Sequence, residues 1–193
     1  MAPDASVFVH EHALCESDDV GPGTRVWAFA HVMRGARVGA DCNVGGHAFV
    51  ESGAVVGDRV TVKNGVLLWD GVTIEDDVFL GPGCVFTNDP RPRVARRLEP
   101  DEFAPTRVCR GASIGANATV VCGLTIGSFA LVGAGAVVTR DVPSHALVVG
   151  NPAALAGWVC ECGRSLDGRL SCTCGRRYRR TDGGIEAETA GAG

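Results

Sequence analysis

An apolar residue stands at every sixth position along most of this chain, and that spacing restricts the possible fold more than any other feature. Two positions before most of these residues lies a small or β-branched residue, as at Ala30, Ala48 and Ala118. A period of six matches neither an α-helix nor simple strand alternation. It is expected when short strands are joined by tight turns and each strand directs one large and one small side chain inward. The apolar series is Phe8, Leu14, Val20, Val26, Val32, Val38, Val44, Val50, Val56, Val62, Leu68, Ile74, Leu80 and Phe86, followed after a gap by Val108, Ile114, Val120, Ile126, Val132 and Val138.

The spacing predicts an all-β protein, a parallel β-helix in which three hexapeptides make one triangular coil. Successive coils of such a helix stack about 4.8 Å apart. The composition agrees, because 46% of the residues are hydrophobic but only 6% are aromatic, and 27 residues are glycine. The core must therefore consist of small and β-branched side chains. An ordinary β-sandwich with coincidental spacing is the alternative.

The repeat is interrupted once. Phe86 and Val108 lie 22 residues apart, which is not a multiple of six. Residues 87–107 are therefore predicted to form a loop that leaves the helix, and they are rich in proline and charged residues. Loops held by a rigid scaffold often carry function. A plain surface excursion is the alternative.

Charge and the chain start bear on partners and location. The net charge of −4 gives no general reason to expect nucleic acid or an anionic membrane as a partner. The N-terminus shows no basic region followed by an apolar run, and no segment approaches the roughly 20 apolar residues that span a bilayer. We therefore expect a cytoplasmic protein, in which clustered cysteines indicate a metal site.

Four of the nine cysteines are clustered near the C-terminus as two pairs, each followed by glycine: Cys160, Cys162, Cys172 and Cys174. Two such pairs resemble the knuckles of a zinc ribbon, although one residue separates the cysteines of each pair where two are usual. Four thiolates suit a structural, tetrahedral Zn²⁺ with no open position; disulfides are the alternative. We expect a zinc-ribbon-like segment over residues 159–180 and a disordered tail over residues 181–193.

A candidate site follows from the coil geometry. Residues 18 apart stack on an 18-residue coil, so Arg34, Ser52, Asp70 and Asn88 form one outward column that ends where the loop begins. Trp69 lies in the next column and needs cover from a ligand or a subunit. A plain subunit interface is the alternative. His31 precedes a core residue and is either a general base or polar surface. No two histidines are four residues apart, which argues against a γ-type carbonic anhydrase.

Several segments resemble the bacterial nucleotide-sugar N-acetyltransferases of the hexapeptide-repeat superfamily. The resemblance covers residues 6–158 and is carried by residues 75–82, by the Phe-Thr-Asn segment at residues 86–88, and by residues 115–117, 121–123, 132–138 and 150–153. It implies a left-handed helix and a homotrimer with active sites in the clefts between subunits. It also implies acetyl transfer from acetyl-CoA to the amino group of a UDP- or dTDP-linked 3-amino sugar.

The resemblance also implies roles for residues, and the column geometry adds others. Asn88 matches the active-site asparagine of the family; because its amide cannot take a proton at neutral pH, we expect it to orient the amine. Gly65 stands where a second asparagine is common, and Trp69 where tyrosine is common. The residues expected to bind the sugar substrate are His31, Asn64, Trp69, Asp70, Glu75, Arg91 and Arg93. The residues expected to bind acetyl-CoA are Gly115, Ala116, Gly133, Ala134, Arg140, Asn151, Pro152 and Ala153.

Two other functions stay open from the sequence alone. One is acyl transfer from an acyl-CoA to a different amine or hydroxyl compound. The other is a non-catalytic assembly protein in which the β-helix presents the cysteine segment to a partner.

Overall fold

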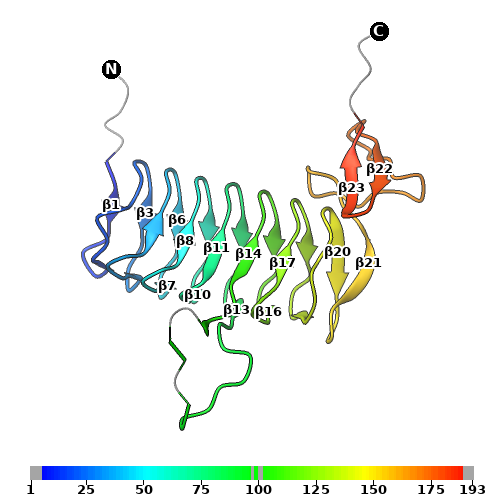
Figure 1. Ribbon diagram of the computed structural model, residues 1–193. Coiled ribbons are helices and arrows are strands. Elements are labelled where there is room, and N and C mark those ends of the chain that lie inside the picture. The colour runs from blue at the N-terminus through cyan, green and yellow to red at the C-terminus, as the bar shows by residue number, and fades with distance from the viewer. Residues whose placement is uncertain (1–5, 97, 100–101, 189–193) are drawn as a thin grey trace, which may run out of the picture.

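The computed structural model describes residues 6–96, 98–99 and 102–188, and in these residues the protein is a triangular prism of parallel strands (Figure 1). Three sheets form its faces, with nine, seven and five strands. We call these face A, face B and face C. The chain runs from each face A strand across the A–B edge to face B, then across the B–C edge to face C, and returns over the C–A edge. The predicted parallel β-helix is confirmed, while its left-handed winding stays an expectation from the family resemblance.

Most strands have only two residues, as expected from a hexapeptide repeat. Face A contains β1 (Phe8–Val9), β3 (Arg25–Val26), β6 (Asn43–Val44), β9 (Thr61–Val62), β12 (Phe79–Leu80), β15 (Ser113–Ile114), β18 (Leu131–Val132), β20 (Ala146–Val149) and β21 (Ala154–Trp158). Face B contains β2 (Leu14–Cys15), β4 (His31–Val32), β7 (Phe49–Val50), β10 (Leu67–Leu68), β13 (Val85–Phe86), β16 (Thr119–Val120) and β19 (Val137–Val138). Face C contains β5 (Arg37–Val38), β8 (Val55–Val56), β11 (Val72–Ile74), β14 (Thr106–Val108) and β17 (Thr125–Ile126).

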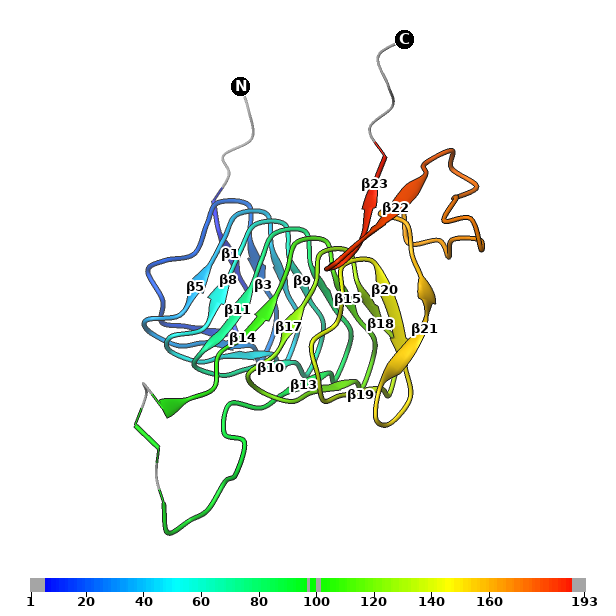
Figure 2. The ribbon, with the colours of Figure 1, turned by 45° about the vertical axis from the view of Figure 1, so that its right-hand side comes forward.

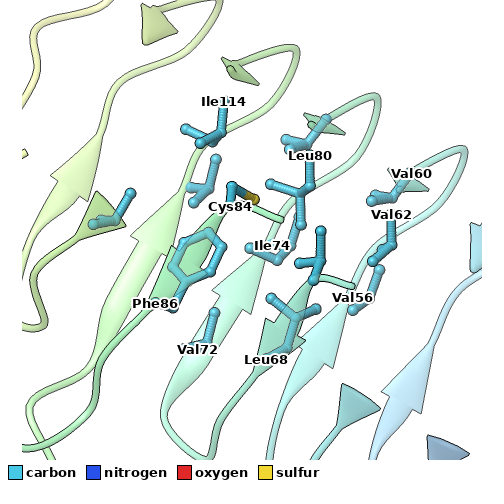
Figure 3. Close-up of a cluster of buried hydrophobic side chains, with 14 of the residues drawn as sticks. Val56, Val60, Val62, Leu68, Val72, Ile74, Leu80, Cys84, Phe86 and Ile114 are labelled. Carbon is cyan, nitrogen blue, oxygen red and sulfur yellow. The ribbon is translucent and has the colours of Figure 1, made fainter. Parts of the chain in front are cut away.

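The core fills the inside of the prism with one large and one small residue from each strand and its preceding turn. Leu68, Ile74 and Leu80 come from three consecutive strands on three different faces and are buried together (Figure 3). Cys84 occupies a small inward position beside Phe86, as the spacing predicts. Burial of this continuous apolar column is the main source of stability for the stacked coils.

The first coil differs from the predicted register. Phe8 pairs with Arg25 and Leu14 pairs with His31, so both lie outside the prism, 46% and 52% exposed. Their neighbours Val9 and Cys15 align instead with the inward residues of the next coil. The prediction that the inward series begins at Phe8 is therefore wrong for the first coil, because a one-residue shift sends every side chain to the opposite face of a strand.

The predicted loop leaves between β13 and β14 and projects away from the prism (Figure 2). It ends two residues earlier than expected, at residue 105. Thr106 lies in the small inward position and pairs with Val72, and Arg107 pairs with Thr73. The loop is thus an insertion at the B–C edge, after which the chain resumes face C without changing the stacking.

The C-terminal end of the prism is closed by β21, which pairs with β20 and is antiparallel to it. The cysteine segment follows and leads into the hairpin of β22 (Tyr178–Thr181) and β23 (Gly184–Ala187). The expectation of a disordered tail from residue 181 is therefore wrong up to Ala187, because β23 pairs with β22 and packs Ile185 into the cysteine segment. The remainder of that tail, residues 189–193, lies outside the described residues. Among the described residues, no helix is long and apolar enough to cross a membrane.

Candidate active site

Asn88 lies at the B–C edge, at the base of the projecting loop. The strand β13 ends at Phe86, and the carbonyl of Asn88 accepts a hydrogen bond from the N–H of Ala104 (3.1 Å), which joins the two ends of the loop. The Trp69 indole N–H donates to the carbonyl of Phe86 (2.9 Å) and so fixes the half-buried ring beside this position. Among the described residues, the Asn88 side chain has no hydrogen-bond partner, and its amide is available to a ligand.

Asp70 belongs to the same column as Asn88 but is directed toward the preceding coil. Its N–H donates to Glu51 Oε2 (2.8 Å), and its carboxylate lies against Gly53, where a Cβ would come within 2.1 Å of Asp70 Oδ1. Glycine is favoured at position 53 because its φ is +87°. The carboxylate is thus held on the N-terminal side of the Asn88 coil.

His31 joins this group through a row of aromatic rings on face B. The His31 and Phe49 ring centroids are 5.3 Å apart in an edge contact, and those of Phe49 and Trp69 are 5.6 Å apart. His31 Nε2 lies 2.9 Å from Glu16 Oε2, a contact that orients the imidazole. The row leads along the prism toward Asn88, so His31 is at its far end, three coils away.

Arg91, Arg93 and Arg96 of the loop are exposed. Asp89 Oδ1 accepts from the N–H of Arg91 (2.7 Å), and the Arg93 guanidinium donates to the carbonyl of Pro92 (2.8 Å). Arg96 forms an ion pair with Glu102 (2.8 Å). Arg91 and Arg93 therefore present positive charge on the loop that starts at Asn88.

Apart from Arg140, which follows β19 at the B–C edge, the residues expected to bind acetyl-CoA line the A–B edge, on the opposite border of face B. Gly115 stacks on Gly133 and Ala134; a Cβ on Gly115 would meet the backbone N of Ala134 at 2.4 Å. Asn64 lies in the same column as Ala116 and Ala134, several coils toward the N-terminus. Bare backbone is exposed along this edge, as a close-lying extended ligand requires.

The same edge continues into the turn between β20 and β21. The Asn151–Pro152 bond is cis, and the N–H of Ala153 donates to the carbonyl of Val137 (2.8 Å). Arg140 and Ala153 line a cavity of about 290 Å³ beneath this turn. The predicted cofactor residues from Gly115 to Ala153 thus all lie in the C-terminal half of the prism, Arg140 at the B–C edge and the others along the A–B edge.

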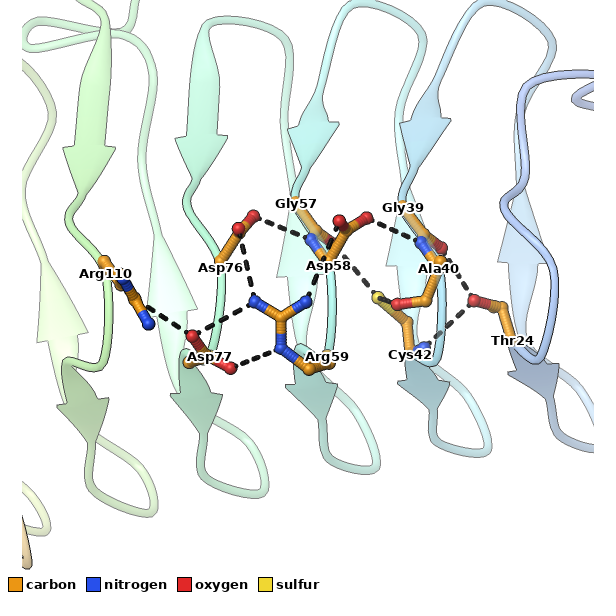
Figure 4. Close-up of polar contacts among 10 residues, drawn as sticks. All are labelled: Thr24, Gly39, Ala40, Cys42, Gly57, Asp58, Arg59, Asp76, Asp77 and Arg110. Atoms are coloured by element: carbon orange, nitrogen blue, oxygen red, sulfur yellow. Dashed lines mark hydrogen bonds and ion pairs between the residues drawn. The ribbon is translucent and has the colours of Figure 1, made fainter.

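Glu75 lies apart from both groups, at the C–A edge. Its carboxylate accepts from the Arg107 guanidinium and from the N–H of Arg110. It continues a ladder along this edge in which Arg59 pairs with Asp77 (2.7 Å) and Arg110 pairs with Asp77 (3.1 Å) (Figure 4). The predicted substrate role of Glu75 stays a prediction, since these contacts account for its carboxylate as a coil-to-coil link.

The four clustered cysteines meet at one point beyond the prism. Their Sγ atoms all lie within 4.8 Å of one another, with 3.5 Å between Cys160 and Cys174 and 3.6 Å between Cys162 and Cys172. All four are free thiols. Ligands of a tetrahedral zinc with Zn–S bonds of about 2.3 Å lie about 3.8 Å apart, so the arrangement fits this ion. Hydrogen bonds from the N–H of Arg176 and from Cys172 lower the pKa of the Cys174 thiol to about 6, which favours the ligating thiolate.

The cysteine segment packs against the prism through side-chain and backbone contacts. His145 at the C–A edge stacks on Phe129 (5.1 Å between ring centroids) and meets Tyr178 edge-on (4.9 Å). The Tyr178 hydroxyl donates to Cys160 Sγ (3.1 Å), and the N–H of Ser144 donates to the carbonyl of Gly183 (3.1 Å). Figures 1 and 2 show this segment on the opposite side of the prism from the projecting loop.

A hollow at the N-terminal part of the A–B edge was not found from the sequence. It measures about 510 Å³ and includes Trp27, Phe29, His47, Lys63 and Asn64 in its lining. Of these only Asn64 was predicted. One signal was available, because Lys63 is the single lysine of the chain.

Comparison with known proteins places the chain in a family. A family model described as the hexapeptide repeat of succinyl-transferase matches residues 35–69 and 105–140, on either side of the loop. Among solved structures, the acetyltransferase domain of PglB from Neisseria gonorrhoeae in complex with acetyl coenzyme A matches with a TM-score of 0.53 at 24% identity, over 80% of this chain and 59% of that one. LpxA, a UDP-N-acetylglucosamine acyltransferase from Bacteroides fragilis, matches with a TM-score of 0.57 at 13% identity, over 82% and 74%. At these identities the likeness shows the fold alone.

A curated relative is much closer in sequence. The chain is 53% identical over 179 residues to the dTDP-3-amino-3,6-dideoxy-α-D-galactopyranose 3-N-acetyltransferase of Aneurinibacillus thermoaerophilus, and the match covers 91% of this chain and 92% of that protein. A match over 91% of 193 residues extends past Cys174, so the relative also has a segment where this chain has its cysteines. The chain therefore belongs to the hexapeptide-repeat family of bacterial nucleotide-sugar N-acetyltransferases.

Proposed function

We propose that this protein transfers the acetyl group of acetyl-CoA to the amino group of a sugar linked to dTDP or UDP. The observation that carries the proposal is the 53% identity over nearly the whole length to an enzyme named for this reaction on a dTDP-linked 3-amino sugar. The B–C edge adds a chemical reason, because it presents an amide that is free to bind and is suited to an amine.

In the reaction, the nitrogen of the sugar amine attacks the thioester carbonyl. The new C–N bond forms, the tetrahedral oxyanion collapses, and the C–S bond breaks. Asn88 accepts a hydrogen bond from the amine and aims its lone pair at the carbonyl. Backbone N–H groups stabilise the oxyanion. The departing thiolate takes the proton of the amine, so no side-chain base is required.

The two ligands occupy different borders of face B. The pantetheine arm lies along Gly115, Ala116, Gly133 and Ala134, and the nucleotide end of the coenzyme lies near Arg140 and the turn of Asn151, Pro152 and Ala153. On the B–C edge, Trp69 and Asp70 contact the sugar, and Arg91 and Arg93 meet the pyrophosphate. The two edges are separated by the width of face B within one chain.

This separation supports a homotrimer. A site that needs both Asn88 at the B–C edge and the A–B edge is completed when the B–C edge of one subunit faces the A–B edge of the next. Face B also presents apolar outward side chains, among them Leu14 and Val85, that are 52% and 39% exposed in the single chain. Large exposed apolar side chains of this kind favour a protein contact.

We further propose that Cys160, Cys162, Cys172 and Cys174 bind one structural Zn²⁺. The ion would hold the segment between Val159 and Tyr178, which has a very small core of its own. The cytoplasm is the proposed location, because its reducing conditions preserve the nine free thiols.

The function is tested by incubating the purified protein with acetyl-CoA and a panel of dTDP- and UDP-linked amino sugars while free thiol is measured. We expect thiol release that depends on one nucleotide sugar, with the acetylated product identified by mass spectrometry. Release with an amine or hydroxyl compound that lacks a nucleotide, and with none of the panel, would favour acyl transfer to a different acceptor.

A further inference from the structure

The hollow near the N-terminal end of the A–B edge has a floor of bare backbone. Gly45 and Gly46 form this floor between the coil of Trp27 and the coil of Lys63. A Cβ on Gly46 would lie 2.9 Å from the carbonyl oxygen of Ala28 and 3.4 Å from the amide nitrogen of Asn64. The floor is thus kept open by the absence of side chains, and its volume of about 510 Å³ lies in the range of small-molecule sites.

Aromatic rings form the walls. Trp27 and Phe29 are 40% and 58% exposed, which is unusual for such large apolar side chains. The rings of His12, Phe29 and His47 stack in a column, with centroid distances of 5.7 and 5.1 Å. The column stops at His47, because the next position is Gly65 and no atom lies within 4 Å of where its Cβ would stand. One face of the last ring is therefore uncovered.

The rim carries hydrogen-bonding groups and one positive charge. The Trp27 indole N–H donates to Asn43 Oδ1 (2.8 Å), which leaves the amide N–H groups of Asn43 as free donors. Asn64 contributes an amide with both donors and an acceptor. Lys63 is exposed, and no carboxylate pairs with it among the residues that the structure describes. An unpaired cation beside aromatic rings and amides suits a planar heterocycle attached to phosphate.

We propose that this hollow binds the nucleoside diphosphate part of the sugar substrate, with the pyrimidine base against Trp27 and the Phe29–His47 rings and the phosphate next to the ribose at Lys63. Arg91 and Arg93, on the B–C edge of the facing subunit in the proposed trimer, then meet the phosphate next to the sugar. The inference rests on the proposed function and extends it by naming where the base is recognised. It also predicts the order of the two ligands along the A–B edge. The nucleotide of the acceptor occupies this edge on the N-terminal side of Asn64, while its sugar reaches the B–C edge of the facing subunit. The coenzyme occupies the A–B edge from Gly115 onward, so the two ligands approach each other from opposite ends.

The test is to measure binding of dTDP, UDP and coenzyme A by isothermal titration calorimetry to the wild type, Trp27→Ala and Lys63→Gln. Removing one stacking ring or one phosphate contact is expected to weaken dTDP binding about tenfold or more. Coenzyme A binding should stay within about twofold. With the full sugar substrate, KM should rise while kcat changes little, because the hollow lies away from the reacting atoms. Lys63→Arg should restore most of the phosphate contact.

The matched control is Phe79→Ala, which removes an aromatic ring of equal exposure, 40%, on the same face but outside the hollow. All variants should keep the wild-type melting temperature and mass. Wild-type affinity for dTDP and UDP in both Trp27→Ala and Lys63→Gln would overturn the subsite, while continued transfer to a nucleotide sugar would leave the proposed function intact. Loss of dTDP binding in these variants, with no transfer by the wild type to any nucleotide amino sugar, would uphold the subsite and reject the function.

Discussion

At the scale of single residues, Asn88 is placed by the backbone around it. The Ala104 N–H and the Trp69 indole hold the strand end and the loop base, and the side-chain amide is left over for a ligand. Asn88 differs in this from Asp70. The Asn88 side chain is free to bind a ligand, whereas the Asp70 carboxylate lies against Gly53.

Asn88→Ala should lower kcat by about 100-fold, because the amine loses its alignment with the thioester carbonyl. The KM for acetyl-CoA should change little, since the proposed pantetheine site lies on the other border of face B. Steady-state kinetics with a verified acceptor test this. His31→Ala serves as the comparison and should retain most of kcat, with a pH profile that still follows the amine of the substrate. Near-full turnover of Asn88→Ala would show that the site assignment is wrong.

The lowered pKa of Asp77 predicts how the stability of the fold depends on pH in acid. Hydrogen bonds from Arg59, and then from Arg110, hold the pKa of its carboxyl below the ordinary 3.8. The folded protein therefore binds fewer protons at Asp77 than the unfolded chain, so the stabilising contribution is complete above pH 3.8 and disappears as pH falls through the lower folded value. Asp77→Asn should lower the melting temperature at pH 7 and have little effect near pH 2. An equal effect at both pH values would contradict this.

At the scale of elements, each strand contributes one large inward side chain to the core. Within one coil, the side chains from the three faces meet at the centre of the prism, with no further layer between them. Neighbouring coils pack directly on one another, so a vacancy in one coil removes contacts from the coils on both sides. The cysteine segment has the opposite character, because its small cluster of Cys160, Cys172, Tyr178 and Ile185 buries little apolar surface.

Leu68→Ala should therefore lower the free energy of unfolding by about 2–5 kcal/mol, the usual cost of a cavity at a fully buried leucine. Urea unfolding followed by circular dichroism measures this change. The matched control is Leu131→Ala, an outward leucine on face A that is only partly buried. A smaller loss for Leu68→Ala than for the control would contradict the packing described.

The purified protein should contain one zinc per chain, measured by atomic absorption. Cys174→Ser should remove the metal and lower the melting temperature, because the bound ion contributes directly to the folding of a segment with little core. Cys84→Ala, a cysteine inside the prism, is the control and should keep the metal. Metal content unchanged by Cys174→Ser would reject a site made of these four ligands.

At the scale of the whole molecule, the proposed active site needs groups from two edges of the prism, which calls for a homotrimer. Light scattering coupled to size-exclusion chromatography should therefore give three times the chain mass of 20.0 kDa. A fully active species with the mass of one chain would contradict a site completed between subunits.

The sequence determines the prism because its inward positions hold residues of two sizes, almost all of them apolar, and this requirement recurs in every coil. It could not settle the first coil, since Phe8 and Val9 are both apolar, as are Leu14 and Cys15. It missed β22 and β23 because most of their residues are exposed and polar and show no apolar alternation. The hollow at Gly45 and Gly46 was missed because its walls come from residues on several coils.

The antiparallel strand β21 affects whether copies of the protein can associate end to end. A solenoid of stacked strands presents unpaired backbone groups at its last coil, and another copy could continue the stack there. Because β21 runs against β20 and opposes every earlier strand of face A, it offers an incoming parallel strand the wrong polarity. Elongation from chain to chain by parallel strand pairing is thereby disfavoured on face A.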